Sequence, residues 1–479
     1  MSDAERVLQL SLISHTNAGK TTLARTLLRR DVGEVLDQAH VTETSERFVM
    51  LELPARDASD PGGRIMLWDT PGFGDSTTLL RELEGRDDPL GWLAEQSFDR
   101  VEQLPLYSSQ QAVLNVVEHA DVVLYLVNAS EEPGMAGYVE PEMQILGWID
   151  RPVIVVLNQT GAPSNSDGRG KAEQRWRWHL ASHAAVRDVI SLDAFTRCWV
   201  QEGLLLLRLQ ALVPELHQGL MTRLLEQWRD ENLETLTASA RTLAELLWKA
   251  ARDSEPAAEG WIARVGQRGP TRALAARLAA ATRAASDQLI AAHRLEGDSA
   301  AWARGALEDV SVPGQRPDPR RAGVVGGVVG GLMGGLAADL ASAGLSLGGG
   351  AIAGAILGGL GLGGLAWAYE QLGSGATPRV VWSKEFLQRF NQECLLRYLA
   401  VAHFGRGSGP WQERQTPEIW TPLVEAVSQR HAGSLARCVA SARGSTDAEL
   451  PPELVSSLDQ ALRDCLMDLY PGTERFLGS

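Results

Sequence analysis

Residues 7–22 read VLQLSLISHTNAGKTT, and this stretch decides the fold of the first part of the chain. The apolar run 7–13 predicts a buried strand, and the run TLARTLLRR, which starts at residue 22, predicts a helix after the polar loop. A strand, a loop that ends in Gly-Lys-Thr and a helix are the context of the pattern GxxxxGK[ST], whose backbone amides surround phosphate groups. The stretch therefore predicts a phosphate-binding loop.

The end of this pattern is matched by Gly19, Lys20 and Thr21. The spacing assigns Lys20 to the β- and γ-phosphates of a nucleotide and the Thr21 hydroxyl to Mg²⁺. Ser14 stands where the pattern has its first glycine, which serves a tight turn. A serine is small enough to fit such a turn, and backbone strain that weakens the loop is the other expectation. The residues predicted to contact the nucleotide in this loop are Asn17, Ala18, Gly19, Lys20, Thr21 and Thr22.

A second motif follows in RIMLWDTPGFGDS, residues 64–76, where a predicted strand ends in Asp-Thr-Pro-Gly. Asp69 at the strand end is expected to hold Mg²⁺ through a water molecule, and the Gly72 amide is expected to sense the γ-phosphate. Read alone, the four residues are also typical of an ordinary turn. The phosphate-binding loop upstream favours the functional interpretation.

Together the two motifs resemble the Era-like branch of the translation-factor-related GTPases, whose phosphate loop reads GxxNxGK[ST] and whose third motif reads DTPG. The resemblance covers residues 5–200 and implies a GTPase that binds GTP and GDP with Mg²⁺. It also implies that Thr42, in HVTETS, closes over Mg²⁺ in the triphosphate state, with Thr44 as the rival. Lys20, Thr42 and Gly72 are thus the catalytic candidates, and Thr21, Thr42 and Asp69 the candidates for the metal.

Two further positions bear on hydrolysis. Asn17 occupies the position that helps potassium-activated relatives coordinate K⁺, and a loop-stabilising role is the alternative. Phe73 follows DTPG where Ras-like proteins carry a glutamine that positions water, so hydrolysis is expected to need a cation, a dimer partner or a residue in trans.

The fourth motif departs from the family pattern. The family expects NKxD after a strand, and its Asp selects guanine, but this chain reads Asn158-Gln159-Thr160-Gly161 after PVIVVL. Asn158 is kept as a nucleotide contact, and Asp167 in the following loop is a candidate to replace the missing carboxylate. The fifth motif is a weak match at Ser191-Leu192-Asp193-Ala194, where Ser191 is the predicted contact.

The order of elements defines the fold class. Further strands are predicted over 48–53 and 121–127, with helices between, which indicates an α/β P-loop domain with a mostly parallel, doubly wound sheet. The long stretch 76–107 is expected to be a helical insertion. Strand patterns disappear after about residue 197, and the predicted parts are 1–200 (Era-like GTPase domain), 201–321 (α-helical extension), 322–368 (glycine-rich helical hairpin) and 369–479 (α-helical region).

The amino-acid composition of the chain argues against several classes of protein. The chain has 479 residues, 44% of them hydrophobic and 22% charged, as in folded globular proteins. The net charge of −15 argues against binding nucleic acid by bulk electrostatics, so no nucleic acid partner is expected. The four cysteines are far apart without a CxxC pair, which favours a reducing compartment over a disulfide framework or zinc site. The N-terminal sequence does not resemble a secretory signal.

The block 322–368 consists almost entirely of Gly, Ala, Leu, Val and Ile, with Asp339 as its one charged residue. Glycines recur at four-residue spacing, as in membrane helices that pack closely. Two spans of about 20 residues fit the block, and the arginines at 316, 320 and 321 suit a cytoplasmic flank. We expect membrane contact through 322–368, by reversible or partial insertion more than by constitutive spanning. Burial of the hairpin inside the helical part is the alternative.

The sequence RYLAVAHFGRG at 397–407, together with the glycine block, resembles an uncharacterised bacterial family that joins an Era-like GTPase domain with a degenerate fourth motif to a helical domain with a glycine-zipper block. This resemblance covers nearly the whole chain. The N-terminal sequence and the arginines before the glycine block favour a cytoplasmic protein at the cytoplasmic face of the inner membrane.

Three functions remain open from the sequence. The leading hypothesis is a membrane-associated GTPase switch that hydrolyses GTP slowly and acts with a homodimer or other protein partner. The first alternative is a pseudo-GTPase that binds nucleotide without turnover, because Ser14 and the NQTG sequence are degenerate. The second alternative is an effector that perforates membranes under nucleotide control.

Overall fold

The computed structural model places two compact units. The first unit comprises 1–233, 403–409 and 469–479, and the second comprises 234–402 and 410–468. The boundary at 233/234 falls inside one long helix, α8 (Glu215–Arg252). The residues that the structure describes are 6–16, 18–29, 45–55, 62–158, 166–194, 198–256, 269–295, 365–368, 379–404, 419–444 and 449–478.

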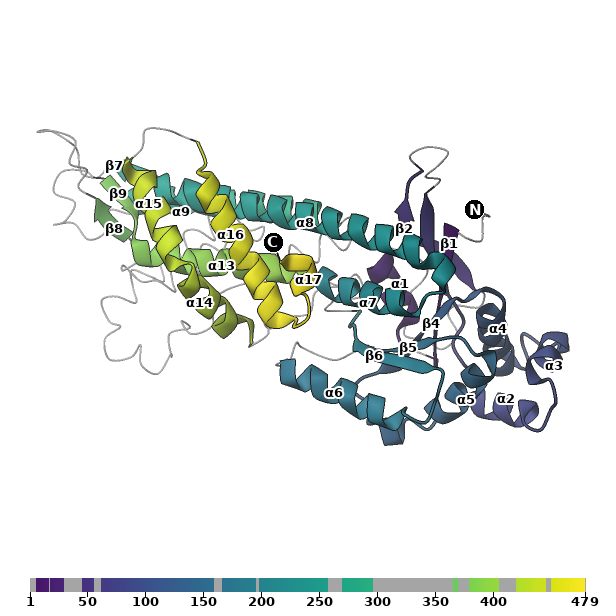
Figure 1. The fold of residues 1–479 in the computed structure, drawn as a ribbon. Coiled ribbons are helices and arrows are strands. Elements are labelled where there is room, and N and C mark those ends of the chain that lie inside the picture. The colour runs from purple at the N-terminus through teal and green to yellow at the C-terminus, as the bar shows by residue number, and fades with distance from the viewer. Residues whose placement is uncertain are drawn as a thin grey trace, which may run out of the picture. The chain divides into compact units, whose positions relative to one another are not determined.

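The first unit is built on a six-stranded sheet with the order β2-β3-β1-β4-β5-β6 (Figure 1). Every pairing is parallel except β2 with β3, which is antiparallel. This is the mostly parallel α/β sheet that the sequence predicts. The strands are β1 (Val7–Ser14), β2 (Glu46–Leu53), β3 (Gly63–Asp69), β4 (Val122–Asn128), β5 (Val153–Asn158) and β6 (Val186–Ser191).

The central strands are apolar because helices cover both faces of a parallel sheet. All six residues of β5 are buried, as are the first six of β4. On one face, Val123, Tyr125 and Val127 of β4 and alternate residues of β5 pack against apolar side chains from the helices. Burial of apolar surface stabilises the folded state by about 25 cal/mol per Å². The buried strands therefore hold their ends in fixed positions for the loops that follow.

The helices of the first unit follow the strands in the order expected for a doubly wound fold. The stretch 76–107, predicted as a helical insertion, contains α2 (Ser76–Leu83) and α3 (Pro89–Glu95), so this prediction is confirmed. The Asp75 carboxylate caps α2 by accepting the Thr78 N–H. The remaining helices are α1 (Lys20–Leu28), α4 (Leu104–His119), α5 (Val139–Ile149), α6 (Ser166–His179), α7 (Trp199–Leu212), the first part of α8, and α17 (Glu474–Leu477).

The second unit is mainly helical, but it also holds a three-stranded antiparallel sheet that sequence reasoning missed. Its strands are β7 (Ser254–Pro256), β8 (Leu365–Ala368) and β9 (Arg379–Trp382), in the order β7-β9-β8. They lie in the predicted α-helical extension, at the end of the predicted helical hairpin and near the start of the C-terminal region predicted as helical. Each strand is only three or four residues long, too short for a clear two-residue period.

The helices of this unit include the rest of α8 with α9 (Gly269–Ala292), α13 (Lys384–Ala402), α14 (Trp420–Arg430), α15 (Ala432–Gly444) and α16 (Pro452–Leu469). Trp382 stacks on Phe386 with ring centroids 4.2 Å apart, next to Phe390. Trp248 is 6% exposed in this unit, and Trp228 is 4% exposed in the first unit. The four cysteines are buried and form no disulfide bond.

The glycine block lies almost wholly outside the described residues; only 365–368 is described, as strand β8. Among the helices that the structure describes, none combines the length and the apolar character needed to cross a bilayer. The predicted hairpin over 322–364 therefore stays a prediction from sequence.

A substitution at Leu12 can test how strongly the sheet supports the phosphate loop. It is fully buried on β1, two residues before the strand ends, so Leu12→Ala leaves a cavity next to the loop. We expect the free energy of unfolding to fall by about 2–5 kcal/mol in urea denaturation followed by circular dichroism. Val101→Ala, at a side chain that is 87% exposed, is the control and is expected to change it by less than about 0.5 kcal/mol. Equal effects would contradict this account of the core.

Candidate nucleotide-binding site

The phosphate loop joins β1, which ends at Ser14, to α1, which begins at Lys20. Gly19 precedes the helix with φ of +89°, a left-handed conformation that favours glycine. Gly19 has no side chain to cap α1, and the first turn of a helix presents backbone N–H groups that suit an anion. Ala18, Lys20, Thr21 and Thr22 lie around this turn, as predicted from the motif. Asn17 lies outside the described residues.

The Lys20 side chain is buried, and its Nζ donates to Ser14 Oγ over 3.1 Å. Burial lowers the pKa of Lys20, while the nearby carboxylates of Asp69 and Glu142 oppose this shift by favouring the ammonium form. The expected backbone strain at Ser14 is wrong: Ser14 is not among the described non-glycine residues with positive φ. Its hydroxyl instead supplies the lysine with an acceptor that the glycine of the usual pattern lacks.

Thr21 and Asp69 come together at the predicted metal position. Thr21 Oγ1 donates to Asp69 Oδ2 over 2.7 Å. Burial raises the pKa of Asp69, and the hydrogen bond from Thr21 and the charge of Lys20 oppose that rise. The other oxygen, Oδ1, is buried and has no hydrogen-bond partner within the described parts of the chain. A hydroxyl next to a carboxylate with an unused oxygen fits hydrated Mg²⁺, a hard cation that prefers oxygen ligands. Thr42 lies outside the described residues.

The segment after β3 lies directly on the phosphate loop. A Cβ at Gly72 would be 2.9 Å from Lys20 Nζ and 3.1 Å from Thr16 Cα, so a side chain at position 72 would require Lys20 and the phosphate loop to shift. The Phe73 N–H donates to Ser14 O over 2.8 Å, and the Thr16 N–H donates back to Phe73 O over 3.2 Å. The structure therefore brings Gly72 to Lys20, as the motifs predict.

The Phe73 ring points away from the site. It is fully buried in the apolar core formed by α2, α4, α5 and the sheet. A side chain in this position has no means of orienting a water molecule at a phosphate. The sequence interpretation, that hydrolysis lacks the glutamine of Ras-like proteins, agrees with this geometry.

Asn158, a predicted nucleotide contact, also connects two loops of the protein. Its side chain is fully buried, with Nδ2 donating 2.9 Å to Ala18 O and Oδ1 accepting the Ala194 N–H over 2.9 Å. It thus ties the phosphate loop to the loop after β6. Residues 159–161 lie outside the described part, and Asp167 falls within helix α6 where a loop was expected.

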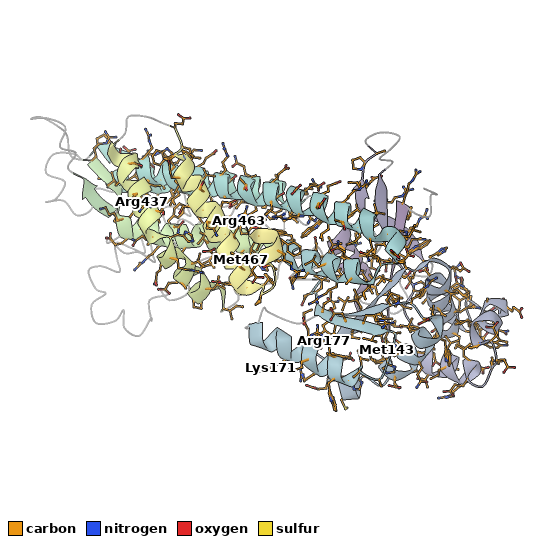
Figure 2. All side chains as sticks on the ribbon, viewed as in Figure 1. Met143, Lys171, Arg177, Arg437, Arg463 and Met467 are labelled. Carbon is orange, nitrogen blue, oxygen red and sulfur yellow. The ribbon has the colours of Figure 1, made fainter. Side chains whose placement is uncertain are left out.

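Ser191, the predicted contact of the fifth motif, ends β6 and takes part in a different arrangement. Its N–H donates to Glu173 Oε1 over 2.8 Å, and its carbonyl accepts from Gln201 Nε2. It lines a cavity of about 910 Å³ between α6, α7 and residues 469–475, next to Arg177 of α6 (Figure 2). Ala194, three residues later, is the part of this motif that Asn158 connects to the phosphate loop.

Sequence reasoning missed a set of polar residues behind the loop. His15 and Glu142 are 127 residues apart and form a contact of 2.8 Å, and Glu142 also accepts from Tyr125 Oη over 2.6 Å. A histidine inside a phosphate-loop pattern is a signal, but its partner was out of reach because the pairing arises only when α5 packs near β1.

Residues 9–159 match the model of a family described as 50S ribosome-binding GTPase. GTPase Era of Heliobacterium modesticaldum (strain ATCC 51547 / Ice1) is 27% identical over 187 residues, which are 38% of this chain and 51% of that protein. The chain thus spans about half the length of this curated relative.

Solved structures of Era give likenesses over a similar part of the chain. Aquifex aeolicus Era, in a variant bound to GDP·AlF4⁻, is 19% identical with a TM-score of 0.32, covering 44% of this chain and 58% of that one. Era in complex with MgGDPNP and nucleotides 1506–1542 of 16S ribosomal RNA is 18% identical with a TM-score of 0.31, over the same shares.

The Asn158 bridge yields a prediction. Asn158→Ala leaves the Ala18 carbonyl and the Ala194 N–H buried without a partner, and each such group costs about 1–3 kcal/mol. We therefore expect urea denaturation to show a loss of about 2 kcal/mol or more, with weaker nucleotide binding. Asn128→Ala, at the end of β4, removes a turn contact to Ser130 and is the matched control, with a smaller loss. A loss at position 158 no larger than at 128 would refute the bridge.

Proposed function

Residues 9–159 belong to an Era-like P-loop GTPase domain, and from this premise we propose that the chain is a GTPase switch that binds GTP and GDP with Mg²⁺ and hydrolyses GTP slowly. One observation carries the proposal: Lys20, Thr21, Asp69 and Gly72 come together from two separate loops, with a buried carboxylate oxygen left unused. A protein that binds nucleotide without hydrolysing it would have little need of all four residues.

The residues present fit the metal and the phosphates. Thr21 and Asp69 would hold Mg²⁺, which neutralises charge on the phosphates when bound. Lys20 would interact with the β- and γ-phosphates, because its ammonium group is buried at the loop, where the Ser14 hydroxyl is its acceptor among the described residues. The Gly72 amide would sense the γ-phosphate, and Thr42 would join the metal in the triphosphate state.

Slow hydrolysis follows from the position of Phe73. Without a side chain that orients water, catalysis would need K⁺ at Asn17, a second copy of the chain or a residue from a partner. Intrinsic rates of comparable GTPases are on the order of 10⁻⁴ to 10⁻² per second. Guanine selection would rest on Asn158, on the loop around Ala194 and on a contact that replaces the missing carboxylate at Gly161.

A polar cluster supports transmission of the nucleotide state to the helical part. Arg29, at the end of α1, donates to Glu202 Oε2 of α7 over 3.0 Å and to Asn232 Oδ1 of α8 over 2.8 Å. Glu202 and Asn232 are buried. The helix that starts at the phosphate loop is thereby hydrogen-bonded to the helix that continues into the second unit, and a shift of α1 would be felt by α8.

Membrane association through 322–368, at the cytoplasmic face of the inner membrane, remains part of this proposal and rests on the sequence of that block.

RNA is not included among the proposed partners. The Era structure that contains 16S ribosomal RNA is of a protein of which this chain spans 58%. The net charge of −15 supports the expectation that no nucleic acid is bound here.

A pseudo-GTPase is the second candidate. The burial of Phe73 and the glycine at position 161 favour it, because both remove groups that working GTPases use. Turnover distinguishes the two candidates.

We expect the purified protein to release phosphate from GTP with Mg²⁺, faster in K⁺ than in Na⁺, and not from ATP. Lys20→Ala is expected to weaken nucleotide binding about tenfold to a hundredfold, the loss for a hydrogen bond to a charged group, and to abolish turnover. Lys171→Ala, on α6, removes a lysine outside the phosphate loop and is the matched control. Fluorescent-nucleotide binding and phosphate release are the measurements.

Other results of these two measurements would lead to different conclusions. Binding of GTP without phosphate release would favour the pseudo-GTPase, and release from ATP would show that loss of the carboxylate at Gly161 changed the substrate. Turnover that survives Lys20→Ala would refute the assigned site.

The membrane proposal has its own test. The full chain is expected to float with anionic vesicles, and the double variant Leu332→Arg, Leu357→Arg is expected to stay at the bottom, because each arginine costs about 2.5–3.5 kcal/mol in a bilayer. Dye leakage from the same vesicles would favour the perforating effector, whereas flotation without leakage would count against it. Equal flotation of both proteins would contradict insertion of this block.

A further inference from the structure

A buried carboxylate lies behind the phosphate loop. Glu142 on α5 is 0% exposed, and its two oxygens take different partners: Oε1 meets His15 Nδ1 at 2.8 Å, and Oε2 accepts from Tyr125 Oη at 2.6 Å. Burial raises the pKa of Glu142, and the contacts with His15 and Tyr125 oppose that rise. A carboxylate out of contact with water is costly unless it is paired, so these partners explain how the group is tolerated.

The partners of Glu142 come from the phosphate loop and the central sheet. His15 lies in the loop, and Tyr125 belongs to strand β4. The backbones of His15 and Phe73 form a parallel β-bridge, which joins the phosphate loop to the segment after the DTPG motif. Glu142 therefore contacts the phosphate loop through His15, and the bridge connects this contact to the second loop of the site.

His15 is held in its rotamer by a second contact. Its ring stacks on Tyr138, with centroids 4.3 Å apart and planes at 18°, and Tyr138 Oη donates to Glu131 Oε2 over 2.9 Å. The His15 side chain is one-third exposed, whereas Glu142 is fully enclosed. The ring is thus fixed from one side by stacking and from the other by the carboxylate.

Glu142 also acts on the lysine through space. Its negative charge, with that of Asp69, favours the ammonium form of Lys20 against the effect of burial. A change at Glu142 is therefore felt in the phosphate loop through its hydrogen bonds and through its charge.

We propose that His15 and Glu142 are positioning residues of the nucleotide site: Glu142, through His15 and the β-bridge between His15 and Phe73, holds the phosphate loop and the segment after Gly72 in register. The role in turnover rests on the proposed GTPase function, whereas the role in holding the two loops does not. Neither residue is assigned a contact with nucleotide, and the histidine acts as the donor that links the loop to the carboxylate.

Two substitutions at His15 separate the donor from the ring. His15→Asn keeps a nitrogen near the position of Nδ1 but loses the stacking, and His15→Phe keeps the stacking but loses the donor. In nucleotide-free protein, we expect amide hydrogen exchange at Thr16 and Phe73 to rise about tenfold in His15→Phe, the effect of losing a hydrogen bond to a charged group. In His15→Asn we expect it to stay within about threefold of the wild type.

Glu142→Gln gives an independent arm, because it is isosteric and removes the charge. It is expected to raise exchange at the same two amides about tenfold, and it carries the test if His15→Phe does not fold. The matched control is Asp464→Asn in the second unit, where His431 Nε2 meets Asp464 Oδ2 at 3.0 Å. This variant breaks a similar histidine–carboxylate pair and is expected to leave Thr16 and Phe73 unchanged.

Wild-type exchange in both His15→Phe and Glu142→Gln would overturn the proposal, and an equal rise in the Asn and Phe variants would overturn the donor role of His15. Turnover is measured in parallel: kcat is expected to fall about tenfold in His15→Phe with KM for GTP changed less than threefold, and His15→Asn is expected to restore it. If the wild-type protein does not hydrolyse GTP, the proposed function fails, while the exchange experiment still decides whether His15 and Glu142 hold the loops.

Discussion

The arrangement of the rest of the site depends on the buried ammonium group of Lys20. A charge removed from water needs compensation, and here it comes from two buried carboxylates, Asp69 and Glu142, whose own pKa values burial raises. Ser14 supplies a neutral acceptor, and Gly72 leaves room for the ammonium group. Bound phosphates would add further negative charge next to the lysine. The burial of the ammonium group is therefore costly for folding but favourable for binding an anion.

The sheet keeps these groups in place, and the core also limits the chemistry. β1, β3 and β5 end at Ser14, Asp69 and Asn158, so the parallel strands deliver the polar groups to one edge. Phe73 contributes its ring to the core and its backbone to the phosphate loop. A residue used in this way stabilises the loop but is lost to catalysis, which is why the proposed hydrolysis depends on a cation or a partner.

The first unit extends beyond the segment that carries the motifs. It includes α7, the first part of α8 and the residues from 469 onward, whose Phe476 packs against Trp228 with centroids 5.6 Å apart. Gly203 of α7 has no room for a Cβ next to these two rings. Through Arg29, Glu202 and Asn232, the helix that begins at Lys20 is connected to α8. A nucleotide-dependent shift of α1 would therefore reach a helix that both units share.

The phosphate loop, the strands of the mostly parallel sheet and the helices of 76–107 could be predicted from the sequence, because each depends on a local pattern of side chains and backbone conformations. The short strands β7, β8 and β9 were missed. The contacts of the Asn158 side chain with Ala18 and Ala194 and the His15–Glu142 pair could not be predicted either. Asn158 and Ala194 are 36 positions apart, and His15 and Glu142 are 127 apart. Such contacts exist only once hydrophobic packing has brought separate helices and strands together.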